Sequence, residues 1–111
     1  MVALRIAITL CAPSMDAQVD HRFGRARYMG LVDTDANEEE VWENPHIDER
    51  SAGVRAAKAL ADAGAQALIS GEVGPNALKV LRAAGIRVYR ARGSARDAVH
   101  ALLSGGLDEV E

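Results

Sequence analysis

The chain has too few cysteines for a disulfide framework and too few consecutive apolar residues for a membrane span. Cys11 is its one cysteine, so no disulfide can form within the chain and cysteine alone cannot build a metal site. No apolar run reaches the roughly 18–20 residues of a membrane-spanning helix, and the first residues lead into a strand-like segment rather than a signal-peptide pattern. These absences predict a cytoplasmic protein with no membrane partner.

An excess of positive charge is also absent. The formal net charge is -3 at pH 7, which argues against nucleic-acid binding as the main task. The charge is nevertheless uneven along the chain, because residues 21–27 hold three arginines and a histidine while residues 33–49 hold eight carboxylates. We therefore expect an electrically polarised surface and no nucleic-acid partner.

A length of 111 residues fits one domain with a substantial core. We predict a single domain over residues 1–105, followed by a flexible tail at residues 106–111. Alternating or continuous apolar residues predict five strands, at residues 4–10, 27–33, 38–43, 67–69 and 86–89. Apolar residues at helical spacing predict three helices, of which two end at Gly64 and Gly85 and the last covers about residues 95–103. Ser94 and Asp97 form a candidate capping box at the start of the last helix.

The order of these elements predicts an α/β fold with a mixed five-stranded sheet. Two helix-strand units require right-handed crossovers between parallel strands, whereas the first three strands form a meander in which the second strand is antiparallel. Ligands of open α/β sheets bind at the carboxyl ends of the parallel strands, where we expect the loops at residues 11–26, 44–52, 70–76 and 90–95 to meet. Candidate ligand-binding side chains on these loops are Cys11, Met15, His21, Arg22, Arg25, His46, Arg50, Arg90 and Arg92.

The loop at residues 11–26 is the strongest candidate for a binding site. Direct turns between strands take about two to five residues, and longer loops in compact domains are usually functional or disordered. Its arginines and glycine indicate an anion-binding loop, although a long solvated connection gives the same pattern. The turn at residues 71–76 adds a second candidate, because Pro75 at the first helical position leaves backbone N–H groups directed at the same space. A plain tight turn explains that motif equally well, and it lacks the Gly-Lys-Ser/Thr of a P-loop.

Enzymatic interpretations find little support. The first strand carries no carboxylate that could hold Mg²⁺ for phosphoryl transfer or nucleic-acid cleavage. A Cys11/His21 pair would suit nucleophilic hydrolysis, but the sequence shows neither an orienting third group nor an oxyanion site. We therefore expect no catalytic activity.

Several motifs in a fixed order resemble the dinitrogenase iron-molybdenum cofactor-binding family. They are Val-Asp-x-Arg-Phe-Gly-Arg-Ala at 19–26, Val-Asp at 32–33, Glu-Asn-Pro at 43–45, Ala-Gly-Val-Arg-Ala-Ala at 52–57, Gly-Glu-Val-Gly-Pro-Asn-Ala at 71–77 and Ala-Gly-Ile-x-Val-Tyr at 84–89. The resemblance extends from residue 4 to about residue 105. It implies a ribonuclease H-like α/β/α fold, in agreement with the sheet expected from the residues.

The resemblance also implies noncovalent binding and carrying of an anionic metal-sulfur cluster, of the iron-molybdenum or molybdenum-copper sulfide type. Relatives include nitrogenase cofactor carriers and small stand-alone proteins, and the implied partners are cluster donor and recipient proteins. The matching motif positions give the expected cofactor-binding residues Arg22, Phe23, Gly24, Arg25, Gly71, Glu72, Val73, Gly74 and Asn76. Topology alone adds Cys11, His21 and His46 as candidate metal ligands; the resemblance assigns them no role.

Two alternatives belong to other functional classes. A cofactor-free interaction or regulatory module could use the same fold to recruit a partner through the polarised surface. A nucleotide- or phosphate-binding protein could use the turn at residues 71–76. The absence of a His-rich segment weakens the case for a role in nitrogenase assembly in particular.

Overall fold

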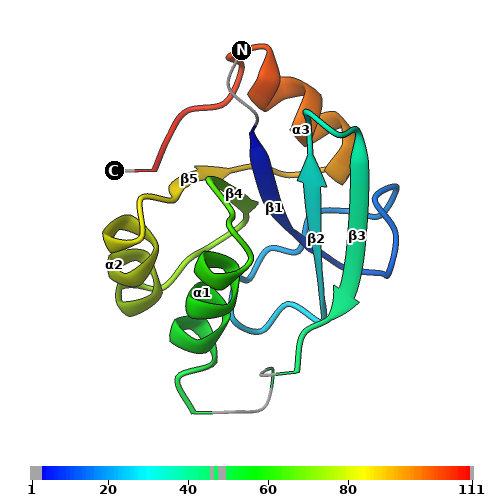
Figure 1. The fold of residues 1–111 in the computed structure, drawn as a ribbon. Helices are drawn as coiled ribbons and strands as arrows, with labels where there is room; N and C mark the ends of the chain where they lie inside the picture. Colours follow the sequence, from blue (N-terminus) through cyan, green and yellow to red (C-terminus); the bar gives the residue numbers. More distant parts are fainter. Residues whose placement is uncertain (1–3, 46, 48–49, 111) are drawn as a thin grey trace.

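The computed structural model describes residues 4–45, 47 and 50–110, and contains five strands and three helices within them. The strands are β1 (Arg5–Leu10), β2 (Tyr28–Asp33), β3 (Glu38–Glu43), β4 (Ala67–Ser70) and β5 (Arg87–Arg90). The helices are α1 (Ala52–Asp62), α2 (Pro75–Ala83) and α3 (Ala95–Leu103). Figure 1 shows the strand meander first and the alternating helices and strands after it. No helix among the described residues is both long enough and apolar enough to cross a membrane.

The strands form one mixed sheet in the order β3-β2-β1-β4-β5. β2 is antiparallel to both of its neighbours, whereas β1, β4 and β5 run parallel. Ile8 of β1 lies opposite Gly30 on one side and Ile69 on the other, so β1 is the central strand. The predicted five-stranded sheet with an antiparallel second strand is confirmed.

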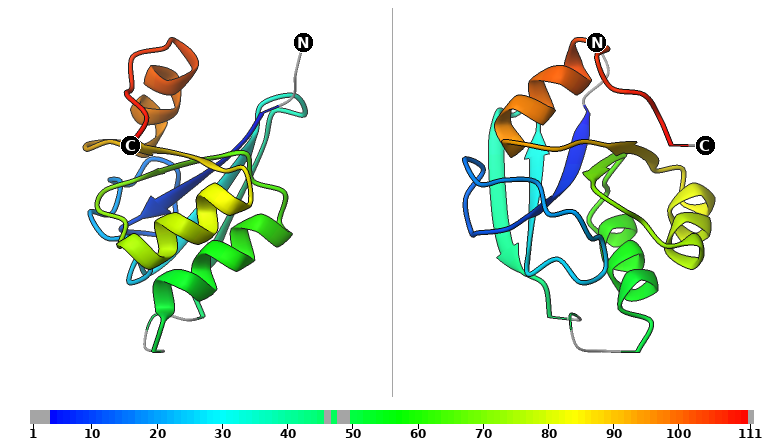
Figure 2. Two further views of the ribbon diagram at one scale, coloured as in Figure 1. Left: turned by 90° about the vertical axis from the view of Figure 1, so that its left-hand side faces the viewer. Right: turned by 180° about the vertical axis from the view of Figure 1, so that it is seen from behind.

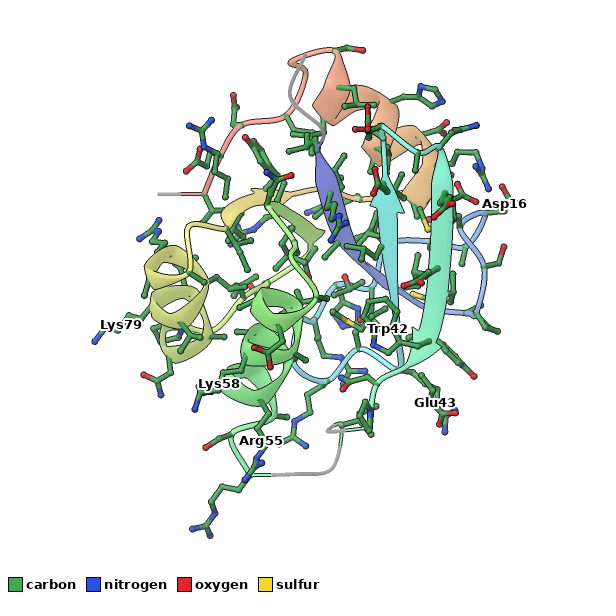
Figure 3. The ribbon with its side chains drawn as sticks, viewed as in Figure 1. Asp16, Trp42, Glu43, Arg55, Lys58 and Lys79 are labelled. Carbon is green, nitrogen blue, oxygen red and sulfur yellow. The ribbon has the colours of Figure 1, made fainter. Side chains whose placement is uncertain are left out.

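The helices cover both faces of the sheet, as the two views in Figure 2 show. β1 is buried on both sides: Ala7 packs in the cluster that includes α1 and α2, and Ile6 and Ile8 pack in the cluster that includes α3. Trp42 of β3 packs against the first cluster, on the α1 side of the sheet (Figure 3). The three-layer α/β/α arrangement is therefore present, and its near-continuous apolar central strand is typical of a sheet covered on both faces.

The helix ends follow the local sequence signals. Gly64 and Gly85 have left-handed φ angles of 80° and 78° directly after α1 and α2, a conformation that favours glycine. Ser94 is the N-cap of α3, and its side chain accepts a hydrogen bond from the Asp97 backbone N–H at 3.5 Å. The predicted cap of α3 and the two glycine helix ends are confirmed.

The described part of the carboxyl-terminal segment is attached to the domain. The backbone N–H of Val110 donates to the carbonyl oxygen of Val88 at 2.7 Å, and Arg82 Nη2 donates to the carbonyl oxygen of Val110 at 2.8 Å. Glu109 also forms a β-bridge with Tyr89. We expected a flexible tail over residues 106–111; the structure gives these contacts for residues 109 and 110, and the flexibility of the segment stays a prediction. Glu111 lies outside the described residues.

Candidate functional site

Backbone hydrogen bonds hold the loop at residues 11–26 across the carboxyl ends of the parallel strands. The N–H of Val19 donates to the carbonyl of Gly93 at 2.8 Å, just before α3. Further along, the N–H of Glu72 donates to the carbonyl of His21 at 2.7 Å, and the N–H of Phe23 donates to the carbonyl of Glu72 at 2.9 Å. The second half of the loop therefore pairs with the segment after β4, through a parallel bridge between Arg22 and Glu72.

Two glycines permit this close approach. A Cβ atom added at Gly71 would overlap the backbone of His21, and one added at Gly24 would overlap the backbone of Gly53 at the start of α1. Any other residue at either position would push the loop away from its support. The loop can therefore contact β4 and α1 at the same time only because both residues lack a side chain.

A buried polar group and a buried aromatic ring fix the loop further. The Thr9 hydroxyl lies 3.0 Å from the carbonyl oxygen of Asp20 and 3.0 Å from Ser70 Oγ, which connects β1, the loop and β4. The buried Asp20 carboxylate accepts the Arg22 backbone N–H at 3.0 Å. Phe23 is 2% exposed and lies in the core cluster on the α1 side of the sheet. Phe23 therefore anchors the loop in the core, between the two arginines beside it.

The loop forms one wall of a cleft of about 390 Å³, within the roughly 300–1,000 Å³ typical of ligand pockets. The starts of α1 and α2 form the other walls. The cleft is lined by Arg22, Phe23, Gly24, Arg25, Ser51, Gly53, Val54, Glu72, Gly74, Pro75, Asn76 and Ala77. We call this the loop–helix cleft.

The two helix starts in the loop–helix cleft lack the caps that α3 has. Neither Ser51, the N-cap of α1, nor Gly74, the N-cap of α2, makes a side-chain cap hydrogen bond, and neither helix has an acidic residue in its first turn. The first N–H groups of a helix have no partner within the helix, and each helix start carries roughly +0.5 of a charge. Two such starts converge on one cleft, where a bound anion would receive their N–H groups.

Arg22 and Arg25 add full charges to these partial ones. Arg25 Nη1 donates to the carbonyl oxygen of Ile47 at 2.8 Å, which restrains its guanidinium group. Arg22 has a side chain 58% exposed, and its Nε lies 3.9 Å from Asp20 Oδ1. Both guanidinium groups keep further N–H donors for a ligand, because each carries five. The loop–helix cleft is therefore suited to an anion.

The structure brings together most of the residues predicted to bind a cofactor. Of these, Arg22, Phe23, Gly24, Arg25, Glu72, Gly74 and Asn76 line the loop–helix cleft. Gly71 instead packs on the backbone of His21, and Val73 packs against the core. Met15, expected on the loop face, is buried in the core cluster on the α3 side of the sheet. Arg50, Arg90 and Arg92 are exposed outside the cleft.

Of the candidate metal ligands, Cys11 and His21 do not line the loop–helix cleft. Cys11 is exposed, and its pKa is raised by partial burial and by the Asp20 carboxylate, with Arg22 acting in the opposite direction. The His21 side chain is 83% exposed, with Nδ1 3.7 Å from Asp20 Oδ1. His46 lies outside the described residues. Among the residues that are described, no three His, Cys, Asp or Glu side chains are grouped as a metal site requires. Direct ligation by Cys11, His21 or His46 stays a prediction.

Sequence reasoning placed the loop at residues 44–52 at this end of the sheet but missed the contribution of the first turn of α1. Ser51, Gly53 and Val54 line the loop–helix cleft, and Ser51 has a left-handed φ of 63°, which is uncommon for a residue other than glycine. A Cβ on Gly53 would lie 3.2 Å from the Ala77 Cβ, so Gly53 lets the starts of α1 and α2 approach each other. A glycine in the first turn of a helix was the available signal, because such a residue often marks a close contact.

Comparison with known proteins gives one family and a group of similar structures. Residues 5–105 match the model of the family described as "Dinitrogenase iron-molybdenum cofactor". No curated protein matches the chain significantly. The apo form of the orange protein from Desulfovibrio gigas is 38% identical, with a TM-score of 0.92 over 98% of this chain and 94% of the other. A putative NifB protein from Thermotoga is 36% identical, with a TM-score of 0.84 over 96% of this chain and 92% of the other.

The close approach at Gly71 leads to a first prediction. Gly71→Ala should lower the free energy of unfolding by about 3 kcal/mol, the upper end of the usual cost of overpacking, because the added Cβ meets backbone rather than a movable side chain. Urea unfolding measures the change. Gly74→Ala is the matched control, since a Cβ there has open space and loses at most about 1 kcal/mol of N-cap preference. Equal unfolding midpoints for the two variants would contradict the role given to Gly71.

The charges around Cys11 lead to a second prediction. The rate of Cys11 alkylation by iodoacetamide should reach half its maximum at a higher pH in the folded protein than in the urea-unfolded chain, because the folded environment raises the pKa of the thiol. Arg22→Ala should move the folded profile higher still, since it removes the nearby cation that lowers this pKa. The unfolded profile, as the control, should not change. A folded profile unaffected by Arg22→Ala would show that Arg22 does not act on Cys11.

Proposed function

The chain belongs to the dinitrogenase iron-molybdenum cofactor family, and from this premise we propose that its loop–helix cleft binds an anionic metal-sulfur cluster noncovalently. The family is associated with cofactor binding and supply, which gives this chain a cofactor-related role. The finer proposal is that the cluster is of the iron-molybdenum or molybdenum-copper sulfide type and is carried as cargo. Transfer would take place in the cytoplasm, between a donor and a recipient protein, with no chemical step on the carrier.

The observation that carries the proposal is the convergence of Arg22 and Arg25 with two uncapped helix starts on one cleft. A thiometallate spreads its negative charge over several soft sulfides. Guanidinium groups and backbone N–H groups suit such a surface, because they are weakly hydrated donors that bind a diffuse anion from several sides. Carboxylate cages instead favour hard cations such as Mg²⁺. The donor set of the cleft therefore fits the proposed cargo.

The solvent exposure of the charged side chains also supports a protein that releases its cluster, rather than one that binds a cluster permanently. The arginines that line the loop–helix cleft stay partly or largely solvent-exposed, and the cleft opens between a loop and two helix starts. Binding by N–H groups and charges needs no covalent bond between the protein and the metal. A cluster held in this way can leave when a recipient offers better ligands.

This proposal predicts that the double variant Arg22→Ala/Arg25→Ala loses cluster retention and keeps its fold. Each charge-assisted hydrogen bond contributes about 1.5–3 kcal/mol, so losing two should weaken binding by roughly 10²- to 10⁴-fold. The measurement is saturable uptake of tetrathiomolybdate, alone and with Cu(I), followed by visible absorption, metal content after gel filtration and amide chemical shifts. The shifts of the wild-type protein should concentrate at residues 11–26 and 70–76.

The double variant Arg90→Ala/Arg92→Ala is the matched control. It removes the same charge from exposed positions outside the loop–helix cleft and should retain the cluster. Equal retention by both double variants would overturn the assignment of Arg22 and Arg25. If the wild-type protein takes up neither thiomolybdate nor an iron-sulfur donor, but nucleotides raise its melting temperature, the cleft is a phosphate site instead.

A further inference from the structure

The loop–helix cleft contains one group that a simple anion site would not have. Among the described residues that line it, the charged side chains are Arg22, Arg25 and Glu72. A carboxylate in the wall of an anion site repels the ligand that the arginines attract. The position of Glu72 is well defined, because its backbone is hydrogen-bonded to both His21 and Phe23 and it pairs with Arg22 in a parallel bridge.

The fold does not require the Glu72 carboxylate. The loop is supported by the backbone groups of Glu72, while its side chain is exposed. In the part of the chain that the structure describes, this carboxylate makes no ion pair, and the acidic partner of Arg22 is Asp20. A neutral side chain would leave the same backbone bonds in place. The negative charge of Glu72 therefore acts mainly on whatever enters the cleft.

The charge at the cleft indicates which anions it accepts. The two guanidinium groups are opposed by Glu72 in the cleft wall and by the buried Asp20 carboxylate, 3.9 Å from Arg22 Nε, while the two helix starts add roughly +0.5 each, so the net charge of the site is only about +1. A site with so small a net charge favours anions of modest charge, spread over a large surface. Without Glu72, the same cleft would carry about +2 and would attract nucleotide triphosphates more strongly, because these are abundant and more highly charged.

We propose that Glu72 sets the charge selectivity of the loop–helix cleft, favouring sulfide clusters and fragments of lower charge over polyphosphates and other more highly charged anions. This inference rests on the proposed cluster-binding function. Glu72 acts by repulsion, which is an effective way to reject competing ligands that attractive contacts alone would admit. The repulsion grows with ligand charge, because the Coulomb energy is proportional to it.

The test compares anions of similar shape and different charge. Tetrathiorhenate carries one negative charge and tetrathiomolybdate carries two, and both are tetrahedral sulfides; magnesium-free ATP represents the highly charged competitors. Glu72→Gln should tighten binding on the order of three- to fivefold per unit of ligand charge. Tetrathiomolybdate should therefore gain more than tetrathiorhenate, and ATP should gain most. Calorimetric titration gives the dissociation constants.

Glu38→Gln is the matched control, because it removes one exposed carboxylate at the start of β3, outside the loop–helix cleft. It should change all three dissociation constants by less than twofold, and both variants should melt at the wild-type temperature. Equal gains for all ligands, no gain, or weaker tetrathiomolybdate binding in Glu72→Gln would overturn the inference. The proposed cluster-binding function would still stand after such a result, provided that the wild-type protein binds tetrathiomolybdate and the Arg22→Ala/Arg25→Ala variant does not. Absence of saturable binding to the wild-type protein would overturn both proposals.

Discussion

The close contact between the loop at residues 11–26 and its two supports is the constraint on which the rest of the site depends. Gly71 allows the loop to lie against the segment after β4, and Gly24 allows it to lie against the start of α1. Both contacts place backbone against backbone, where no rotamer change can relieve an added atom. With the loop held there, Phe23 enters the core and the flanking arginines lie at the edge of the cleft.

The three helix starts differ in whether side chains of the protein satisfy their first N–H groups. α3 has a serine cap and an acidic residue in its first turn, which satisfy its N–H groups and its dipole. α1 and α2 have neither and both open on the loop–helix cleft. The N–H groups that a cap would satisfy are thus left for water or for a ligand, and the proposed cargo would take the place of the missing caps.

Two carboxylates reduce the net positive charge that the arginines give this site. Asp20 is buried beneath Arg22 and orients its backbone, and the same charge helps to keep the Cys11 thiol protonated. Glu72 is exposed beside Arg22 and faces the ligand space. A carrier must bind its cargo and also release it. A cleft with moderate net charge and no converging metal ligands among the described residues suits reversible binding better than a strongly basic cage would.

Much of this architecture follows from the sequence, because strand and helix signals are local and the direction of each connection is limited by chain geometry. Hydrophobic periodicity, helix-ending glycines and the two crossovers were enough to obtain the strand meander and the mixed five-stranded sheet, and to bring Arg22, Arg25 and the start of α2 to one edge. Only the tertiary structure decided that α1 completes the cleft, that Gly71 and Val73 serve packing, and that Met15 is buried. These outcomes depend on contacts between residues far apart in the chain. A local sequence pattern cannot predict how closely the backbones of two such segments approach each other.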